Sequence, residues 1–161
     1  MIRYSLFLCL ICMSCMSTAS ESWDVDFSAV SESGTKLELL REVEQDFFPV
    51  FEVVYGGDVV RRFDGSLVEV ESFHDAGTGL RYLILQEASG GSGCPATYTL
   101  FDFSLTPYFM SDSIGNCSDQ PKISLSGSGV VIEFPAAGLA SAVQYFYSNG
   151  EVSEKAVTPQ K

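Results

Sequence analysis

Apolar and polar positions alternate with a period of two along most of the chain, which is the pattern of half-buried β-strands. Residues 50–55 show this alternation first, and Gly56-Gly57 supplies the positive φ angles of a tight hairpin before residues 58–63 return. The same pattern predicts strands over residues 67–73, 80–86, 96–103, 107–110, 122–126, 129–134, 143–148 and 151–155.

Two of these segments carry further information. Residues 80–86 are apolar on both faces except at Arg81, which indicates a central strand covered on both sides. Asn149-Gly150 separates the last two strands and is the strongest short hairpin signal in the chain. We therefore expect a mainly β fold, a single-domain antiparallel sandwich, barrel or meander of about 8–10 strands over residues 35–155.

The N-terminal part allows two interpretations. In residues 35–47, Leu39, Leu40 and Val43 fit one face of a helix, whereas the apolar alternation that begins at Leu37 fits a strand nearly as well. We expect an N-terminal helix or a long edge strand there. The flanking segments are polar, and we expect a loosely ordered lead-in over residues 21–34 and a disordered tail over residues 156–161.

Residues 1–20 have the composition of a secretory signal peptide. A short positive start precedes an apolar run of 11 residues, and small residues follow around Ala19. The run is too short to span about 30 Å of hydrocarbon. An alternative is a lipoprotein signal that is acylated at Cys15. We expect a periplasmic or secreted protein with no integral membrane segment after signal cleavage.

Charge narrows the classes of partner. The chain of 161 residues has 9 Lys and Arg against 21 Asp and Glu, and removal of residues 1–20 leaves 8 basic residues and a formal charge of −13. Nucleic acids and anionic lipid surfaces both require clustered basic side chains, so neither is an expected partner. Because 14 of the 21 acidic residues precede residue 76, we expect contact with a basic protein partner through residues 21–75.

Two cysteines remain after signal cleavage, Cys94 and Cys117, which lie 23 positions apart. In an exported protein such a pair is expected to form one disulfide. A redox-active pair is disfavoured, because Cys94 and Cys117 do not form a Cys-x-x-Cys motif and no flanking basic residue would lower a thiol pKa.

Candidate catalytic and metal-binding residues are few. His74 is the only imidazole base, and none of the serines lies in a Gly-x-Ser-x-Gly motif. The glycine-rich residues 89–93 lack the lysine of a phosphate-binding loop, which favours a flexible turn. The acidic doublets could bind Ca²⁺ or serve glycoside hydrolysis, but with 21 acidic residues such doublets occur by chance, so solvated strand faces are the favoured interpretation. We expect no cofactor and no metal. The doublets are Asp24/Asp26, Glu42/Glu44 and Glu69/Glu71.

The segment around the cysteines resembles an uncharacterised group of exported bacterial proteins. Residues 90–96 match a Gly-Gly-x-x-Cys-Pro-Ala strand start, and residues 115–119 match a Gly-x-Cys-Ser-Asp return. The likeness extends over about residues 80–155. It implies an exported location and a disulfide, and it carries over no catalytic residue.

Three functional hypotheses remain. The first is an acidic interaction protein, such as an inhibitor or immunity protein against a basic cell-wall hydrolase or toxin, and not an enzyme. Its partner-binding candidates are Glu69, Glu71, Asp58 and Asp64. The second is a small-ligand-binding or envelope accessory domain with an aromatic pocket, for which the candidate rings are Tyr82, Tyr98, Phe101, Phe103, Tyr145 and Tyr147. The third is a hydrolase with a cryptic site.

Overall fold

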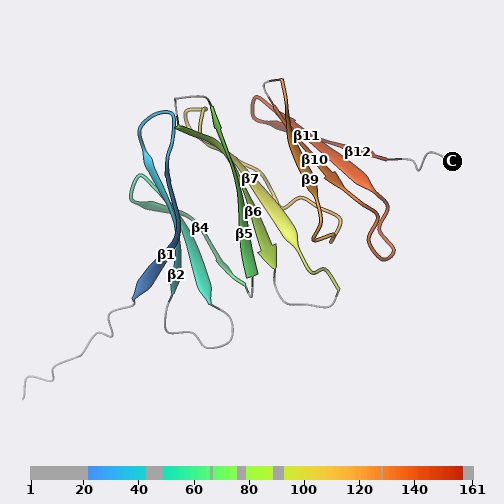
Figure 1. Ribbon diagram of the computed structural model, residues 1–161, viewed down its shortest axis with the longest axis horizontal. Helices are drawn as coiled ribbons and strands as arrows, with labels where there is room; N and C mark the ends of the chain where they lie inside the picture. Colours follow the sequence, from blue (N-terminus) through green and yellow to red (C-terminus); the bar gives the residue numbers. More distant parts are fainter. Residues whose placement is uncertain are drawn as a thin grey trace, which may run out of the picture.

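The computed structural model describes residues 22–42, 49–65, 67–75, 79–88, 93–127 and 129–157, and within these ranges the chain is all β. The strands form three antiparallel sheets of four, which we call sheets A, B and C (Figure 1). Sheet A contains β1 (Trp23–Val30), β2 (Lys36–Glu42), β3 (Val50–Tyr55) and β4 (Asp58–Asp64). Sheet B contains β5 (Leu67–Asp75), β6 (Gly79–Ala88), β7 (Thr97–Asp102) and β8 (Phe109–Met110). Sheet C contains β9 (Lys122–Ser126), β10 (Gly129–Phe134), β11 (Val143–Ser148) and β12 (Glu151–Ala156).

The mainly β prediction is confirmed, and the architecture is a sandwich of three layers in which each layer is a meander of consecutive strands. Sheet B lies between the other two (Figure 1). On β6, Leu83 and Leu85 belong to the apolar cluster shared with sheet A, and Tyr82 and Ile84 belong to the cluster shared with sheet C. The strand predicted to be covered on both sides is therefore the middle of the molecule.

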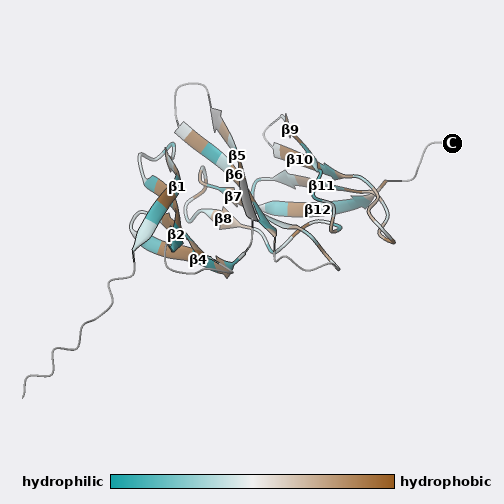
Figure 2. Cartoon of the chain, turned by 60° about the horizontal axis from the view of Figure 1, so that its bottom comes forward, coloured by the Kyte–Doolittle hydropathy of each residue, from teal (hydrophilic) through white to brown (hydrophobic). Residues whose placement is uncertain are grey.

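Sheets A and C each turn one face to sheet B, so their strands keep a clear alternation (Figure 2). In sheet C, Val130, Ile132 and Phe134 point inward from β10, and all three are at most 2% exposed. The predicted Asn149-Gly150 hairpin joins β11 to β12, and both residues have positive φ, as a type I′ turn requires.

A helix over residues 35–47 was one of two predicted alternatives, and it is wrong for the described part, residues 35–42. Leu37 and Leu39 of β2 are both buried against sheet B, while Leu40 faces away, so burial follows a period of two. The edge-strand alternative is also corrected, because β2 pairs with β1 on one side and β3 on the other. Residues 43–48 lie outside the described ranges.

The lead-in predicted for residues 21–34 is instead largely a strand. β1 pairs antiparallel with β2, and Phe27 and Ala29 pack against the sheet A cluster. Asp24, Asp26 and Ser28 are exposed because β1 is an edge strand of an outer sheet, and Val25 and Val30 are also more than half exposed. Trp23, Val25, Phe27 and Ala29 alternate with polar residues, so the period of two was present in the sequence. At the other end, Ala156 of the predicted tail completes β12, and the Val157 amide donates to the Ala142 carbonyl oxygen at 3.0 Å.

Two polar contacts join sheet A to sheet B. Arg61 of β4 makes a bidentate pair with Glu87 of β6, with Nε and one terminal nitrogen 2.7 and 2.9 Å from the carboxylate oxygens. Thr99 of β7 donates a third bond to Glu87 at 2.9 Å. At the other contact, buried Ser31 forms a β-bridge with Leu80. The Arg61–Glu87 pair is half-buried and bidentate, and bidentate pairs of this kind are the strongest ion pairs in proteins.

One buried carboxylate joins sheet B to sheet C. Asp102 of β7 is 1% exposed and accepts a 2.7 Å hydrogen bond from the Tyr147 hydroxyl of β11. The other carboxylate oxygen accepts bonds from the Ser104 amide and hydroxyl at 2.9 and 2.6 Å. Burial, together with the neighbouring Asp102, raises the pKa of Tyr147 well above its ordinary value.

The close approach of β1 to β6 leads to a first prediction. Gly79 has φ +115°, and a Cβ there would lie 2.7 Å from the Val30 carbonyl oxygen. We expect Gly79→Ala to lower the free energy of unfolding by about 3 kcal/mol, through backbone strain plus displacement of β1. Gly34 has φ +81° with open space around it, so Gly34→Ala should lose only about 1 kcal/mol. Urea denaturation measures the free energy of unfolding of both variants. Equal losses in Gly79→Ala and Gly34→Ala would show that the β1–β6 contact is looser than described.

The Tyr147 hydroxyl yields a prediction on alkaline stability. The folded state favours the neutral phenol, so this contribution is complete below the unfolded tyrosine pKa of about 10 and is lost as the pH rises above it. We expect the wild-type protein to lose about 1 kcal/mol more between pH 10 and pH 11 than Tyr147→Phe, because the unfolded tyrosine is already half ionised at pH 10. Urea denaturation across this range measures the difference, and parallel profiles for the two proteins would contradict it.

Candidate functional site

A cleft opens where one end of sheet A meets sheet B. It has a volume of about 800 Å³, against about 480 Å³ for the cavity beside the disulfide and about 250 Å³ for one between sheets B and C. Ligand sites usually measure about 300–1,000 Å³. The cleft is lined by the β1–β2 turn, the β3–β4 hairpin and the β7–β8 loop. We call it the Tyr55 cleft; its lining residues are Glu32, Ser33, Thr35, Tyr55, Asp58, Val59, Val60 and residues 103–108.

Three aromatic rings form one wall of the Tyr55 cleft. Phe103 is 2% exposed, and the Tyr55 ring lies against it with centroids 4.7 Å apart. Tyr108 meets Tyr55 edge to face at 5.4 Å and lies 5.9 Å from Phe103. The two tyrosines are half-buried, so they present ring surface to the cleft while Phe103 supports them from behind.

Hydroxyl groups surround the tip of Tyr55. Its hydroxyl lies 3.2 Å from Ser31 Oγ and 3.2 Å from Ser33 Oγ, and Ser33 is 3.0 Å from Thr35 Oγ1. Burial raises the pKa of Tyr55, but hydrogen bonds from Ser31, Ser33 and Thr35 outweigh it, so the pKa lies below its ordinary value. The tight turn that holds these hydroxyls is closed by the Ser31 amide, which donates to the Thr35 carbonyl oxygen at 2.9 Å.

Carboxylates provide the charge of the Tyr55 cleft. Glu32 and Asp58 line it, and no Lys, Arg or His does so among the described lining residues. Asp58 is exposed in the β3–β4 hairpin and forms no ion pair with any described residue. Every polar side-chain atom of the described lining is an oxygen. The cleft therefore presents hydrogen-bond acceptors beside an aromatic surface.

The four predicted partner-binding acids do not form one patch. Asp58 and Asp64 occupy the two ends of β4, about 20 Å apart at the rise of a strand. Glu71 lies on the sheet C side of β5, where it lines the 250 Å³ cavity with Asp119. Glu69 belongs to β5, but its side chain is outside the described part. Only Asp58 lies in the Tyr55 cleft.

The remaining candidate residues from the sequence either form ion pairs within a sheet or lie outside the described part of the chain. Asp24 and Asp26 both pair with Arg41, with N–O distances of 3.7 and 3.1 Å. No group of three or more metal-ligating side chains gathers among the described residues. His74 lies in β5 with its side chain undescribed, and residues 1–21 and 89–92 are outside the described ranges. No helix in the described chain is long and apolar enough to span a membrane.

The aromatic candidates divide between core and cleft. Tyr82, Tyr98, Phe101 and Tyr147 are all at most 3% exposed and fill the two apolar clusters. Of the predicted rings, Phe103 alone lines the Tyr55 cleft, beside Tyr55 and Tyr108, which the sequence analysis did not single out. The signal for this wall was the dense mixture of aromatic residues and proline in residues 103–109.

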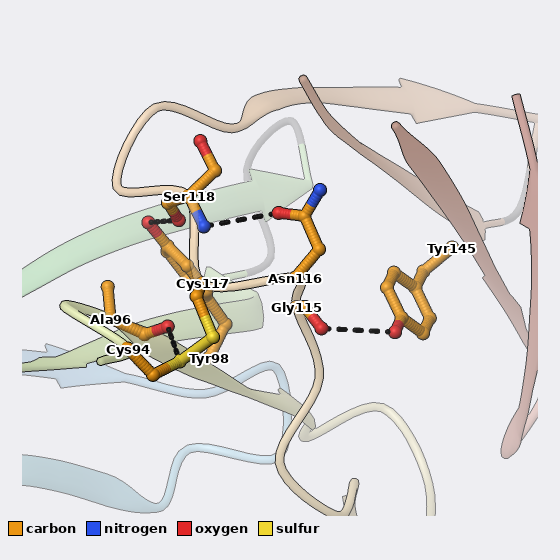
Figure 3. Close-up of a disulfide and its surroundings, with 8 residues drawn as sticks. All are labelled: Cys94, Ala96, Tyr98, Gly115, Asn116, Cys117, Ser118 and Tyr145. Atoms are coloured by element: carbon orange, nitrogen blue, oxygen red, sulfur yellow. Dashed lines mark hydrogen bonds between the residues drawn. A yellow bond between two sulfur atoms is a disulfide. The ribbon is translucent and has the colours of Figure 1, made fainter. Parts of the chain in front are cut away.

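The predicted disulfide joins Cys94 to Cys117, with 4.6 Å between their Cα atoms (Figure 3). It fixes the start of β7 to the segment that leads into sheet C. Tyr98 and Ile114 bond through both backbone amides nearby, at 2.9 and 2.8 Å. Cys94 Sγ also approaches the Ala96 carbonyl oxygen at 3.6 Å, which is a contact and not a hydrogen bond because a disulfide sulfur carries no proton.

Asn116 extends this connection to sheet C. Its side-chain nitrogen donates to the carbonyl oxygens of Pro135 and Ser141 at 2.7 and 2.9 Å. The Tyr145 hydroxyl of β11 donates to the Gly115 carbonyl oxygen at 3.4 Å (Figure 3). The disulfide segment thus holds sheets B and C at their shared end, and the surroundings of Cys94 and Cys117 are structural.

Comparison of the chain with protein-family models, with curated proteins and with solved structures finds no match.

The disulfide has a measurable consequence. We expect the double variant Cys94→Ser, Cys117→Ser to lose about 3 kcal/mol of unfolding free energy, because the unfolded chain regains the freedom of a loop of about 23 residues. Urea denaturation of the oxidised wild type, the reduced wild type and the variant measures this. The reduced wild type should match the variant, and an unchanged midpoint in both would contradict the structural role.

Proposed function

We propose that the protein is an exported, acidic interaction protein that binds a basic protein partner through the Tyr55 cleft. The observation that carries this proposal is the composition of the cleft: two carboxylates, oxygen acceptors and aromatic rings, with no basic side chain in its described lining. Seven of its residues come from the N-terminal part of the chain, where the acidic residues are concentrated.

Ion pairing within sheet A supports this location. Lys36, Arg41 and Arg62 neutralise acidic residues of their own sheet, at N–O distances of 2.7 Å to Glu38, 3.1 Å to Asp26 and 3.0 Å to Glu52. Asp58 is left without such a partner in the described chain. Because an exposed unpaired carboxylate attracts basic groups at long range, Asp58 contributes to the attraction of a basic partner at the cleft.

The disulfide is compatible with an oxidising extracellular compartment. Together with the signal-like residues 1–20, it supports a periplasmic or secreted location for the proposed function, with lipid anchoring at Cys15 as the alternative. Basic cell-wall hydrolases and toxins act in such compartments, and an acidic cleft that accepts a basic group from one of them would make this protein an inhibitor or immunity protein.

A second candidate function is a small-ligand-binding domain. It is favoured by the aromatic wall, because half-buried tyrosine rings with neighbouring hydroxyl groups can hold a neutral ligand such as a sugar. The two functions predict different effects of removing the Asp58 charge. Binding of a basic protein should weaken, whereas binding of a neutral ligand does not depend on this carboxylate.

Asp58 and Asp64 form a matched pair for testing the first proposal, because both are exposed on β4 and each change to Asn removes one charge. We expect Asp58→Asn to weaken capture of a basic protein about tenfold, or about 1.4 kcal/mol, and Asp64→Asn to leave it nearly unchanged. Pull-down from the extracytoplasmic fraction of the source cells, at 50 and 300 mM NaCl, is the measurement.

Support requires a captured protein of high isoelectric point whose binding falls with salt and depends on Asp58. Capture of no basic protein at 50 mM NaCl would refute the proposal. Equal losses in the two variants would instead show that binding is spread over the acidic surface and does not use the Tyr55 cleft. Circular dichroism of both variants controls for folding.

A further inference from the structure

We propose that the group the Tyr55 cleft receives is the guanidinium of an arginine side chain; this inference rests on the proposed function above and names its chemistry. A basic partner offers lysine and arginine, which differ in shape. An ammonium is a compact point charge with three donors, whereas a guanidinium is flat, has five N–H donors and stacks on aromatic faces.

The arrangement of the rings selects a flat cation. Tyr55, Phe103 and Tyr108 contact one another, with centroids 4.7 to 5.9 Å apart, so no cation fits between them. A cage for a methylated ammonium needs separated rings around the charge. Here the free surface is the exposed side of Tyr55 and Tyr108, and a planar cation gains most from lying along such a surface.

The polar groups complete the match. Ser33 and Thr35 stand beside the Tyr55 hydroxyl, and Asp58 lies on the same hairpin as Tyr55. The described lining holds two carboxylates, which only accept hydrogen bonds, and hydroxyl groups, which can accept as well as donate, so the cleft can accept the N–H groups of a ligand that only donates. A guanidinium stacked on Tyr108 can direct its N–H groups outward toward these oxygens and toward the carboxylate.

The test is an NMR titration of the exported protein with its disulfide intact. The probes are N-acetyl-arginine amide, its isosteric neutral analogue N-acetyl-citrulline amide, and N-acetyl-lysine amide with a free ε-amine. We expect the arginine probe to bind with a Kd of about 1 mM and to shift the signals of Tyr55, Asp58 and Tyr108. The citrulline probe should bind at least about tenfold more weakly, and the lysine probe at least about threefold more weakly.

Variants separate stacking from charge. Tyr108→Leu should weaken the arginine probe about threefold or more, whereas Tyr108→Phe keeps the ring and should retain the wild-type Kd. Phe146→Leu is the matched control, because this ring is 43% exposed on sheet C and lies outside the cleft, so its loss should change nothing.

Three results would overturn the inference: equal binding of the arginine and citrulline probes, shifts that lie away from the Tyr55 cleft, or no binding of the arginine probe up to 20 mM. If a basic partner is still captured through Asp58, such a result refutes the guanidinium alone and the proposed function stands. If neither the probe nor an Asp58-dependent partner binds, both fail. Binding of chitotetraose at the same residues, with no response to arginine and no Asp58-dependent partner, would refute both in favour of the small-ligand candidate.

Discussion

Both faces of sheet B must be kept from water at the same time, and the rest of the structure follows from this requirement. Leu83, Ile84 and Leu85 are consecutive residues of β6, and each is at most 1% exposed. Consecutive strand residues point to opposite faces, so one apolar layer cannot cover all three. Sheets A and C each supply one covering face. Removal of either sheet would expose apolar area worth about 25 cal/mol per Å², so the three layers are energetically interdependent.

The polar contacts between the layers complement this burial by setting its register. Apolar surfaces slide over one another at little cost, whereas the Arg61–Glu87 pair and the Tyr147–Asp102 bond fit in one position only. The Tyr55 cleft forms where sheet A and sheet B are no longer covered by each other's strands, and turns and a loop take over from the sheets. Binding chemistry at such a place is supported by rigid layers without disturbing their cores.

Much of the sandwich could be predicted from alternation alone, because burial on one face gives a strong period of two. Residues 80–86 even indicated the middle layer, since a strand covered on both sides has no polar face. β1 was missed although Trp23, Val25, Phe27 and Ala29 alternate with polar residues, and β2 was ambiguous because Leu39 and Leu40 fit two periods. The Tyr55 cleft could be predicted only in part: Asp58 and Phe103 were separate candidates, but their meeting with Tyr108 in one cleft is set by the packing of sheet A on sheet B, which no local pattern encodes.

The order of the strands in space bears on how the molecule assembles. In every sheet each strand neighbours the strands next to it in sequence, and the sheets follow one another along the chain as A, B and C. Hydrogen-bonded pairing therefore requires only short loop closures, whose entropic cost is small. The slow part of folding is then the packing of side chains between the sheets. The chain can build each layer locally and then stack it on the one before, and the disulfide from Cys94 to Cys117 holds sheets B and C together.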